Sequence, residues 1–245
     1  MFKNWNWFER ILLLVNVAFG VYFLVSGAVY DWLALLGLVA SISNTLCVIL
    51  TAKKKVINFA WGVLGTLSYG IVAFMFANTG EWMLNLLYYL PTNIIAWIAW
   101  YKHSEDKINV RARAMTWKQI LVTLAVSIVG IALYAWFLCQ PSVQIFLYHS
   151  VTGFTYWKYL IDSFGVIGSI VGMILLIKQF REQWLVWIAV DVMTIILWCF
   201  TFNPTMILMW ATMLANATYG YIKWLEKEKI DVQSRSIPGK VPAAA

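Results

Sequence analysis

Eight long apolar runs dominate this chain of 245 residues. The hydrocarbon core of a bilayer is about 30 Å thick, so a helix needs about 20 apolar residues to cross it. Runs of this length lie at residues 9–29, 31–50, 57–78, 82–101, 118–139, 157–177, 183–201 and 204–224. They are apolar on all sides, whereas the strands of a membrane barrel alternate apolar and polar residues. The sequence therefore predicts an all-α integral membrane protein with eight transmembrane helices.

The amino-acid composition also indicates a membrane protein, and it excludes several other classes of protein. Hydrophobic residues make up 62% of the chain and charged residues 12%, against about 45–50% and 25% in soluble domains. This excludes a disordered chain, a nucleic-acid-binding module and a disulfide scaffold. The three cysteines are widely spaced and form no CxxC pair, so we expect no metal site, and no cofactor.

The basic residues lie almost entirely on one side of the predicted membrane. Of the 18 Lys and Arg residues, all but Lys158 lie near the start of the first run, or near or after the end of the second, fourth, sixth or eighth. Positive charge collects in cytoplasmic loops. Both termini are therefore predicted to be cytoplasmic.

A weak internal repeat is visible. Residues 43–61 align with residues 169–187 at an offset of 126, and Gly65 then corresponds to Asp191. Runs two to four and six to eight cross the membrane in the same directions, and run five restores the orientation between them. We interpret this as a 1+3+1+3 plan of two parallel three-helix repeats joined by a linker helix, typical of parallel-repeat transporters. Eight helices without a repeat is the alternative.

This interpretation divides the chain into five segments. They are an extra first helix (1–29), a first repeat (30–102), a cytoplasmic loop with the linker helix (103–140), a second repeat (141–225) and a cytoplasmic tail (226–245).

Polar groups at membrane depth are costly and mark functional sites. Asp191 lies near the centre of run seven, on one helical stripe with Trp184, Trp187, Thr194 and Trp198. The further candidates in other runs are Trp61, Asn85, Tyr88 (or Tyr89), Asn93, Asn216 and Tyr219. The alternatives are an interfacial Trp184, interhelical hydrogen bonds for the asparagines and a structural hydrogen bond for Asp191. Aromatic residues at the ends of runs are assigned to interfacial belts: Trp82, Trp100, Tyr101, Trp117, Trp157 and Trp224.

The chemistry of the stripe favours one kind of ligand. Aromatic faces stack flat rings and attract cations, a lone carboxylate favours positive charge, and amides suit hydroxyl or carboxamide groups. We therefore expect a flat, cationic, hydroxylated organic molecule. A proton-coupled role for Asp191, a membrane enzyme and a receptor are the alternatives; an enzyme would need a convergent acid/base or metal set.

The pattern Trp184-x-x-Trp187-x-x-x-Asp191, followed by Asn216-x-x-Tyr219, resembles the PnuC-type nicotinamide riboside transporters over about residues 30–225. The resemblance implies a SWEET-like fold and facilitated diffusion of nicotinamide riboside across a bacterial inner membrane by alternating access. It also implies a cytoplasmic kinase that traps the substrate for NAD synthesis, and we expect a homo-oligomer. Related carriers resemble thiamine and riboflavin transporters. Because thiamine is also a flat cation, it remains an alternative substrate.

Overall fold

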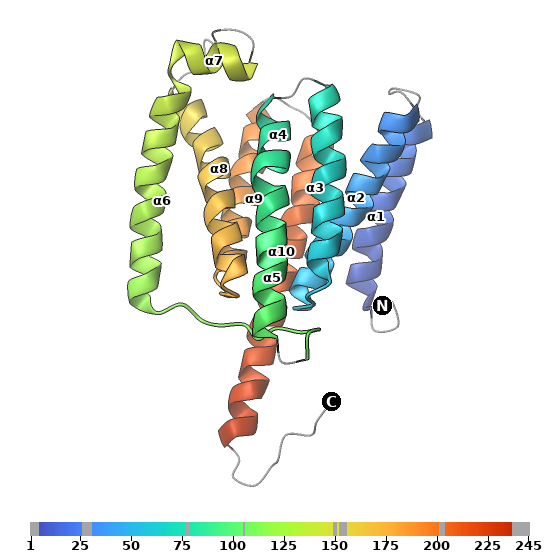
Figure 1. Ribbon diagram of the computed structural model, residues 1–245, viewed down its shortest axis with the longest axis vertical. Helices are drawn as coiled ribbons and strands as arrows, with labels where there is room; N and C mark the ends of the chain where they lie inside the picture. Colours follow the sequence, from blue (N-terminus) through green and yellow to red (C-terminus); the bar gives the residue numbers. More distant parts are fainter. Residues whose placement is uncertain are drawn as a thin grey trace.

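The computed structural model describes residues 5–25, 31–76, 79–104, 106–148, 151, 156–200 and 204–236, and its regular elements there are helices (Figure 1). In chain order these are α1 (Trp7–Val25), α2 (Asp31–Ala52), α3 (Asn58–Met75), α4 (Thr79–Met83), the π-helix η1 (Leu84–Tyr89), α5 (Leu90–His103), α6 (Trp117–Leu138), α7 (Pro141–Tyr148), α8 (Tyr156–Ile177), α9 (Gln183–Phe200) and α10 (Pro204–Ser236).

Four of the described helices are long and apolar enough to cross a membrane. Their apolar segments are Trp32–Ala52, Asn58–Met75, Trp117–Leu138 and Tyr156–Ile177. In α6 only 6% of this segment is buried, so Leu, Val and Ile side chains cover nearly its whole outer surface. A water-soluble protein does not expose an apolar surface of this size, which indicates contact with lipid.

The helices pack as two triplets. In the first half α3 lies between α2 and the continuous helix α4–η1–α5, and in the second half α9 lies between α8 and α10. The halves meet where α5 packs on α8 and where α10 packs on α2, while α1 covers α2 and α6 covers α8. Figure 1 shows α1 and α6 at opposite sides of the bundle, with both ends of the chain near its lower end.

Two turns at that lower end have the same backbone hydrogen bonds. Turn 1 (residues 53–57) joins α2 to α3, and turn 2 (residues 178–182) joins α8 to α9. Each closes its helix with a Schellman motif, in which the left-handed residue is Lys54 (φ 61°) or Gln179 (φ 62°). Every one of these hydrogen bonds in turn 1 recurs in turn 2 at an offset of 125. The predicted offset of 126 is therefore wrong by one residue.

This corrected offset changes which residues correspond. Because α3 begins at Asn58 and α9 at Gln183, Thr66 corresponds to Asp191, in place of Gly65. The offset of 126 pairs Trp61 with Trp187, and tryptophan is frequent in this chain. The backbone hydrogen bonds of a turn, which give the offset of 125, are not visible in the sequence.

Four aromatic rings close the space between the halves near the turns. We call Phe59, Trp100, Trp184 and Trp224 the central aromatic cluster. Trp100 Nε1 donates to the Leu176 carbonyl at 2.8 Å, and Trp224 Nε1 donates to the Thr51 carbonyl at 3.2 Å.

These two hydrogen bonds are reciprocal. Each tryptophan belongs to one half and bonds to the other, at carbonyls that are again 125 residues apart. Edge-to-face contacts add Phe59 to Trp100 and Trp184 to Trp224, with centroids 4.9 and 5.8 Å apart. Trp100 and Trp224 are both 0% exposed, so their assignment to an interfacial belt is wrong. The sequence shows how near a residue lies to the end of its helix. It does not show whether a neighbouring helix covers the side chain.

The fourth predicted run holds a local irregularity. Pro91 lacks an N–H and clashes with the preceding turn of a helix, and the wide π turn η1 lies directly before it, with the Leu90 N–H donating to the Asn85 carbonyl.

Two further helices differ from the predicted runs. α7 occupies part of the stretch between runs five and six, and it lies across the upper end of the bundle (Figure 1). α10 continues to Ser236, beyond the predicted end of the eighth run at residue 224.

Candidate functional site

Asp191 lies in the interior of the second half, one turn of α9 beyond Trp187. It is 3% exposed. No hydrogen bond or ion pair joins its carboxylate to another residue that the structure describes. A buried charge is costly unless it is paired, so an unpaired carboxylate at this depth indicates a ligand-binding role.

Glycines on the neighbouring helices seat the two indoles of the stripe. A Cβ atom at Gly172 of α8 would lie 2.8 Å from Cε2 of Trp187, and a Cβ at Gly220 of α10 would lie 2.6 Å from Cζ2 of Trp184. Real side chains do not approach so closely. Because these two glycines have no side chain, the indole of Trp187 can pack against α8 and the indole of Trp184 against α10.

Several other buried polar atoms near this stripe lack partners. Asn216 is 3% exposed, and its Oδ1 accepts no hydrogen bond from the described residues. Gln183, at the first position of α9, is 0% exposed, and neither of its amide atoms is paired there. The indole Nε1 of Trp184 is also unpaired in the described part of the chain. Unsatisfied buried groups cost about 1–3 kcal/mol each, which favours water or a ligand as their partner.

Sequence reasoning missed Gln183. The signal that could have found it is a polar amide at the start of an otherwise apolar run, at a position where Asn58 stands in the first half. Asn58 is equally buried, but its Nδ2 donates to the Lys55 carbonyl at 2.6 Å.

Two tyrosines face this region from the first half. The Tyr88 hydroxyl donates to the Ile170 carbonyl at 3.1 Å, which ties η1 to α8. Tyr89 lies beside Ser169 and within electrostatic range of Asp191. Of the two tyrosines that the sequence proposed as alternatives, Tyr89 is the one that interacts electrostatically with the Asp191 carboxylate.

The remaining predicted residues are engaged elsewhere. Three bond to carbonyls of their own helix: Asn85 to Glu81, Asn93 to Tyr89 and Thr194 to Val190, at 2.9, 2.9 and 2.8 Å. Trp61 packs with a separate cluster that contains Trp5, Leu12, Leu46 and Ile49. The side chain of Trp198 lies outside the described residues.

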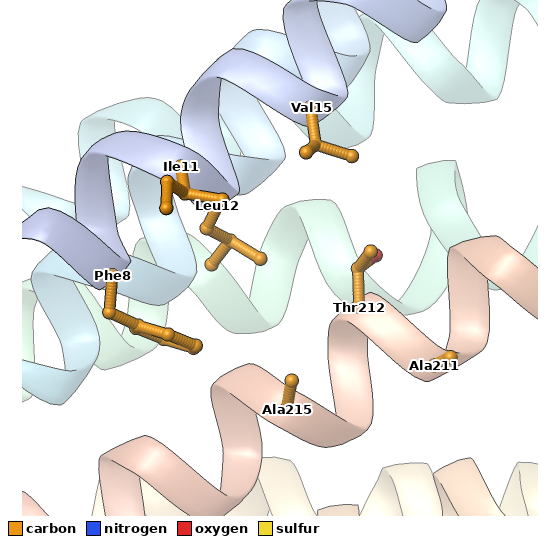
Figure 2. A pocket seen from close by; sticks show the side chains of 7 residues that line it. All are labelled: Phe8, Ile11, Leu12, Val15, Ala211, Thr212 and Ala215. Carbon is orange, nitrogen blue, oxygen red and sulfur yellow. The ribbon is translucent and has the colours of Figure 1, made fainter.

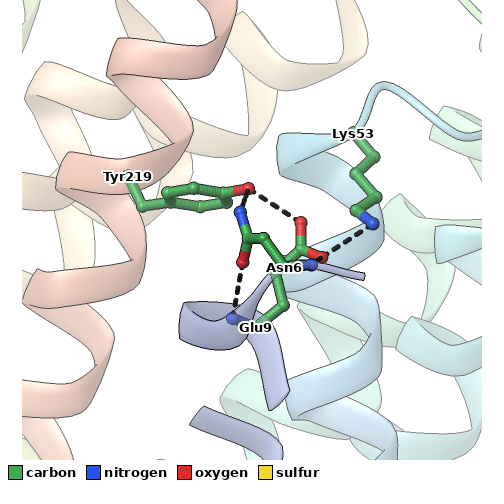
Figure 3. A network of polar contacts seen from close by, with 4 residues as sticks. All are labelled: Asn6, Glu9, Lys53 and Tyr219. Carbon is green, nitrogen blue, oxygen red and sulfur yellow. Dashed lines mark hydrogen bonds and ion pairs between the residues drawn. The ribbon is translucent and has the colours of Figure 1, made fainter. Parts of the chain in front are cut away.

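Tyr219 belongs to a network at the start of α1 (Figure 3). Its hydroxyl donates to Glu9 Oε1 at 2.8 Å and accepts from Asn6 Nδ2 at 2.8 Å. Glu9 is buried and forms an ion pair with Lys53 at 2.7 Å. The network joins α1 to the end of α2 and to α10. A sequence signal for it existed, because Glu9 is an acid in the first apolar run.

A groove lies between α1 and α10 (Figure 2). Its volume is about 210 Å³, and its walls are apolar apart from Thr212, whose hydroxyl bonds to the Met209 carbonyl at 2.6 Å. It offers neither charge nor spare hydrogen bonds to a polar ligand. We therefore place the candidate site at the Asp191 stripe and not in this groove.

Comparisons with known proteins agree with the family that the motif suggested. The profile of the nicotinamide mononucleotide transporter family matches residues 34–226. The nicotinamide riboside transporter PnuC of Neisseria mucosa is 32% identical over 241 residues, which is 94% of this chain and 85% of that protein. The protein of the same name from Haemophilus influenzae is 30% identical over 230 residues, covering 93% of each chain.

A solved structure is also similar. The crystal structure of the vitamin B3 transporter PnuC superposes with a TM-score of 0.71 at 31% sequence identity, covering 94% of this chain and 95% of that one. Four apolar helices of membrane-spanning length accompany this match. The chain therefore belongs to the nicotinamide mononucleotide transporter family, and it is a multi-pass membrane transporter, not an enzyme.

Proposed function

We propose that this protein carries nicotinamide riboside across a bacterial inner membrane by facilitated diffusion, with the Asp191 stripe as its substrate site. The observation that carries the proposal is the buried Asp191 carboxylate, which has no partner among the described residues. A pyridinium ring supplies the missing positive charge. The names of the relatives, nicotinamide riboside transporters, support the same substrate.

The charge of the site favours the riboside over its phosphorylated form. The sequences of α3 and α9 contain no Lys or Arg, and α10 contains none before Lys223. A phosphate group is ordinarily bound by Arg or Lys. A mononucleotide at this depth would instead bring its negative charge toward Asp191, which would weaken binding.

Each part of the substrate has a matching group in this proposal. The pyridinium ring stacks on the indole of Trp187, with its charge facing Asp191. The ribose and carboxamide groups bond to the open amide atoms of Asn216 and Gln183. Trp184 forms the end of the site toward the central aromatic cluster.

For the topology we propose eight transmembrane helices in the 1+3+1+3 order. They are α1, α2, α3, α4–η1–α5, α6, α8, α9 and α10, with α7 on the surface. The matching turns and the reciprocal tryptophan bonds support two parallel repeats. The positive charge at the end of the bundle that carries both turns supports a cytoplasmic location for that end and for both termini.

Transport in this scheme needs no covalent step. The two triplets rock about the midplane site, and the central aromatic cluster closes the cytoplasmic end in the arrangement seen here. A cytoplasmic kinase that phosphorylates the riboside would keep uptake running toward NAD synthesis. The chain would act as a homo-oligomer whose subunits meet on apolar helix faces.

Two measurements test the proposal. Titration of the purified protein, followed by tryptophan fluorescence, should show saturable binding of nicotinamide riboside and much weaker binding of its mononucleotide, thiamine and riboflavin. Proteoliposomes without any ion gradient should equilibrate labelled nicotinamide riboside across their membrane. Tight thiamine binding without a response to nicotinamide riboside would overturn the substrate, and a strict need for an ion gradient would overturn facilitated diffusion.

A further inference from the structure

One loop bonds to both turns. The segment that leads from α5 to α6 includes residues 106–116, which we call the strap. The Val56 N–H donates to the Ile108 carbonyl at 2.8 Å, and the Val110 N–H donates to the Lys54 carbonyl at 3.1 Å. These hydrogen bonds dock the first part of the strap on turn 1.

The second part of the strap docks on turn 2. The Arg113 N–H donates to the Gln179 carbonyl at 2.9 Å, and the Arg181 N–H donates to the Arg113 carbonyl at 2.9 Å. Lys54 and Val56 correspond to Gln179 and Arg181 at the offset of 125. The strap therefore bonds to the same pair of backbone groups in each half.

Each docked part has a further anchor. On the first side, Val110 is buried in the same apolar core as the central aromatic cluster. On the second side, the Met115 N–H donates to the Glu182 carboxylate at 3.0 Å, and Glu182 is also paired with Arg181. The strap thus connects the two turns at the end of the bundle where the central aromatic cluster lies.

The stretch of chain between the two docked parts is short. Only Arg111 and Ala112 separate Val110 from Arg113, and three Cα–Cα steps span at most about 11 Å. While both parts stay docked, the two turns are tied at this distance. Rocking of the halves must separate the turns to open this end.

We propose that the strap is a length-limited gate: the end of the bundle that carries the turns opens only when the strap leaves one turn. The inference rests on the proposed transport cycle. In this proposal, the backbone hydrogen bonds of the strap hold the closed state. Residues 111 and 112 set the largest distance by which the two turns can separate while both parts stay docked.

Paired cysteines test this gate. The bridged pairs Lys55–Asn109 and Arg113–Phe180 join the strap to turns 1 and 2, and bridged residues lie at separations that a disulfide can span. In a protein with Cys47, Cys139 and Cys199 replaced by alanine, Lys55→Cys with Asn109→Cys ties the strap to turn 1. Arg113→Cys with Phe180→Cys ties it to turn 2. Uptake of nicotinamide riboside is measured in proteoliposomes before and after reduction.

Each single link leaves one part free to release, so uptake should stay within about twofold of the reduced protein. Both links together should lower uptake at least about tenfold, and reductant should restore it. Six Gly and Ser residues inserted between Arg111 and Ala112 add about 13 Å of flexible reach and should restore uptake with both links intact. Full uptake by the doubly linked protein, or no rescue by the insertion, would overturn the gate.

A second measurement does not depend on disulfide formation. Hydrogen exchange of the Val56, Val110, Arg113 and Arg181 amides is compared with and without saturating nicotinamide riboside on both sides. Faster exchange of one docked pair during turnover is expected, and unchanged protection of both pairs would contradict the proposal. If the substrate itself is wrong, the reduced protein shows no uptake at all, which separates that failure from a failure of the gate.

Discussion

The two halves of the molecule share the parts that close it but not the parts that would bind a ligand. At the turns the same hydrogen bonds recur, and Trp100 and Trp224 bond reciprocally across the interface. Deeper in the membrane the correspondence ends, because Thr66 stands where Asp191 does and Gly62 stands where Trp187 does. In the proposed transport cycle, the shared parts lie where the two halves move apart, and the unshared parts lie where the asymmetric substrate binds.

The polar groups of the two halves also differ in their partners. In the first half Thr66 bonds to the Gly62 carbonyl at 2.8 Å and Asn58 bonds to the Lys55 carbonyl, so both are satisfied by their own helix or turn. The corresponding Asp191 and Gln183 have no partner among the described residues. In the proposed repeat, these polar groups are satisfied locally in the first half, whereas their counterparts keep hydrogen-bonding capacity open in the second.

Removing the charge of Asp191 tests this difference most directly. Asp191→Asn should weaken binding of nicotinamide riboside at least about tenfold, or about 1.4 kcal/mol, because the pyridinium loses its counter-charge. Thr66→Val is the matched control in the first half and should leave the affinity nearly unchanged. Both purified variants are titrated with nicotinamide riboside. Equal affinities for wild type and Asp191→Asn would show that the carboxylate does not contribute to the site.

Trp187 provides a second test, because its first-half counterpart Gly62 has no side chain. Trp187→Ala should lower the affinity roughly fivefold, the equivalent of about 1 kcal/mol for a lost aromatic stack. The control is Trp136→Ala, since Trp136 lies on the exposed surface of α6. If both variants bind equally well, the ring does not stack on Trp187.

Loss of either of the two reciprocal tryptophan hydrogen bonds should destabilise the protein by a similar amount. Trp100→Phe and Trp224→Phe each remove one Nε1 donor while keeping an aromatic ring, so each should cost about 1 kcal/mol of stability. The melting temperature should fall roughly 2–4 °C in each variant. A loss in only one variant would show that the two halves do not share this closure equally.

The sequence predicted the burial of Asp191 in the asymmetric part but not the burial of the tryptophans in the symmetric part. Asp191 was identified because an acid in an apolar run is conspicuous, and the structure buries it as expected. Trp100 and Trp224 were assigned to a belt because they lie near the ends of their runs. Their burial depends on which helix covers them, and hydropathy does not encode that packing.

Long-range contacts explain the other differences. Tyr219 was grouped with Asn216 by helical spacing, yet its hydroxyl bonds to Glu9, which is 210 residues away in the sequence. The sequence did not indicate the strap, because four of its hydrogen bonds to the turns join backbone atoms, which every residue carries. The helices, their order and the family could be read from the sequence, whereas the repeat offset and the closure needed coordinates.

The part of the strap that docks on turn 1 should respond to acid through Asp106. Asp106 accepts hydrogen bonds from the backbone and side chain of Asn109 and from the Ile108 N–H, which hold the pKa of its carboxyl below the ordinary range. A lowered pKa means that this stabilisation is complete above the ordinary Asp pKa of about 3.9 and is lost as the pH falls through the lower folded value. Amide exchange at residues 108 and 109, corrected for its intrinsic rate, should therefore rise about twofold to threefold on acidification. Asp106→Asn should remove this dependence while the Met115 amide on turn 2 keeps its own protection. Equal pH dependence in the variant and the wild type would mean that Asp106 does not order residues 108 and 109 of the strap.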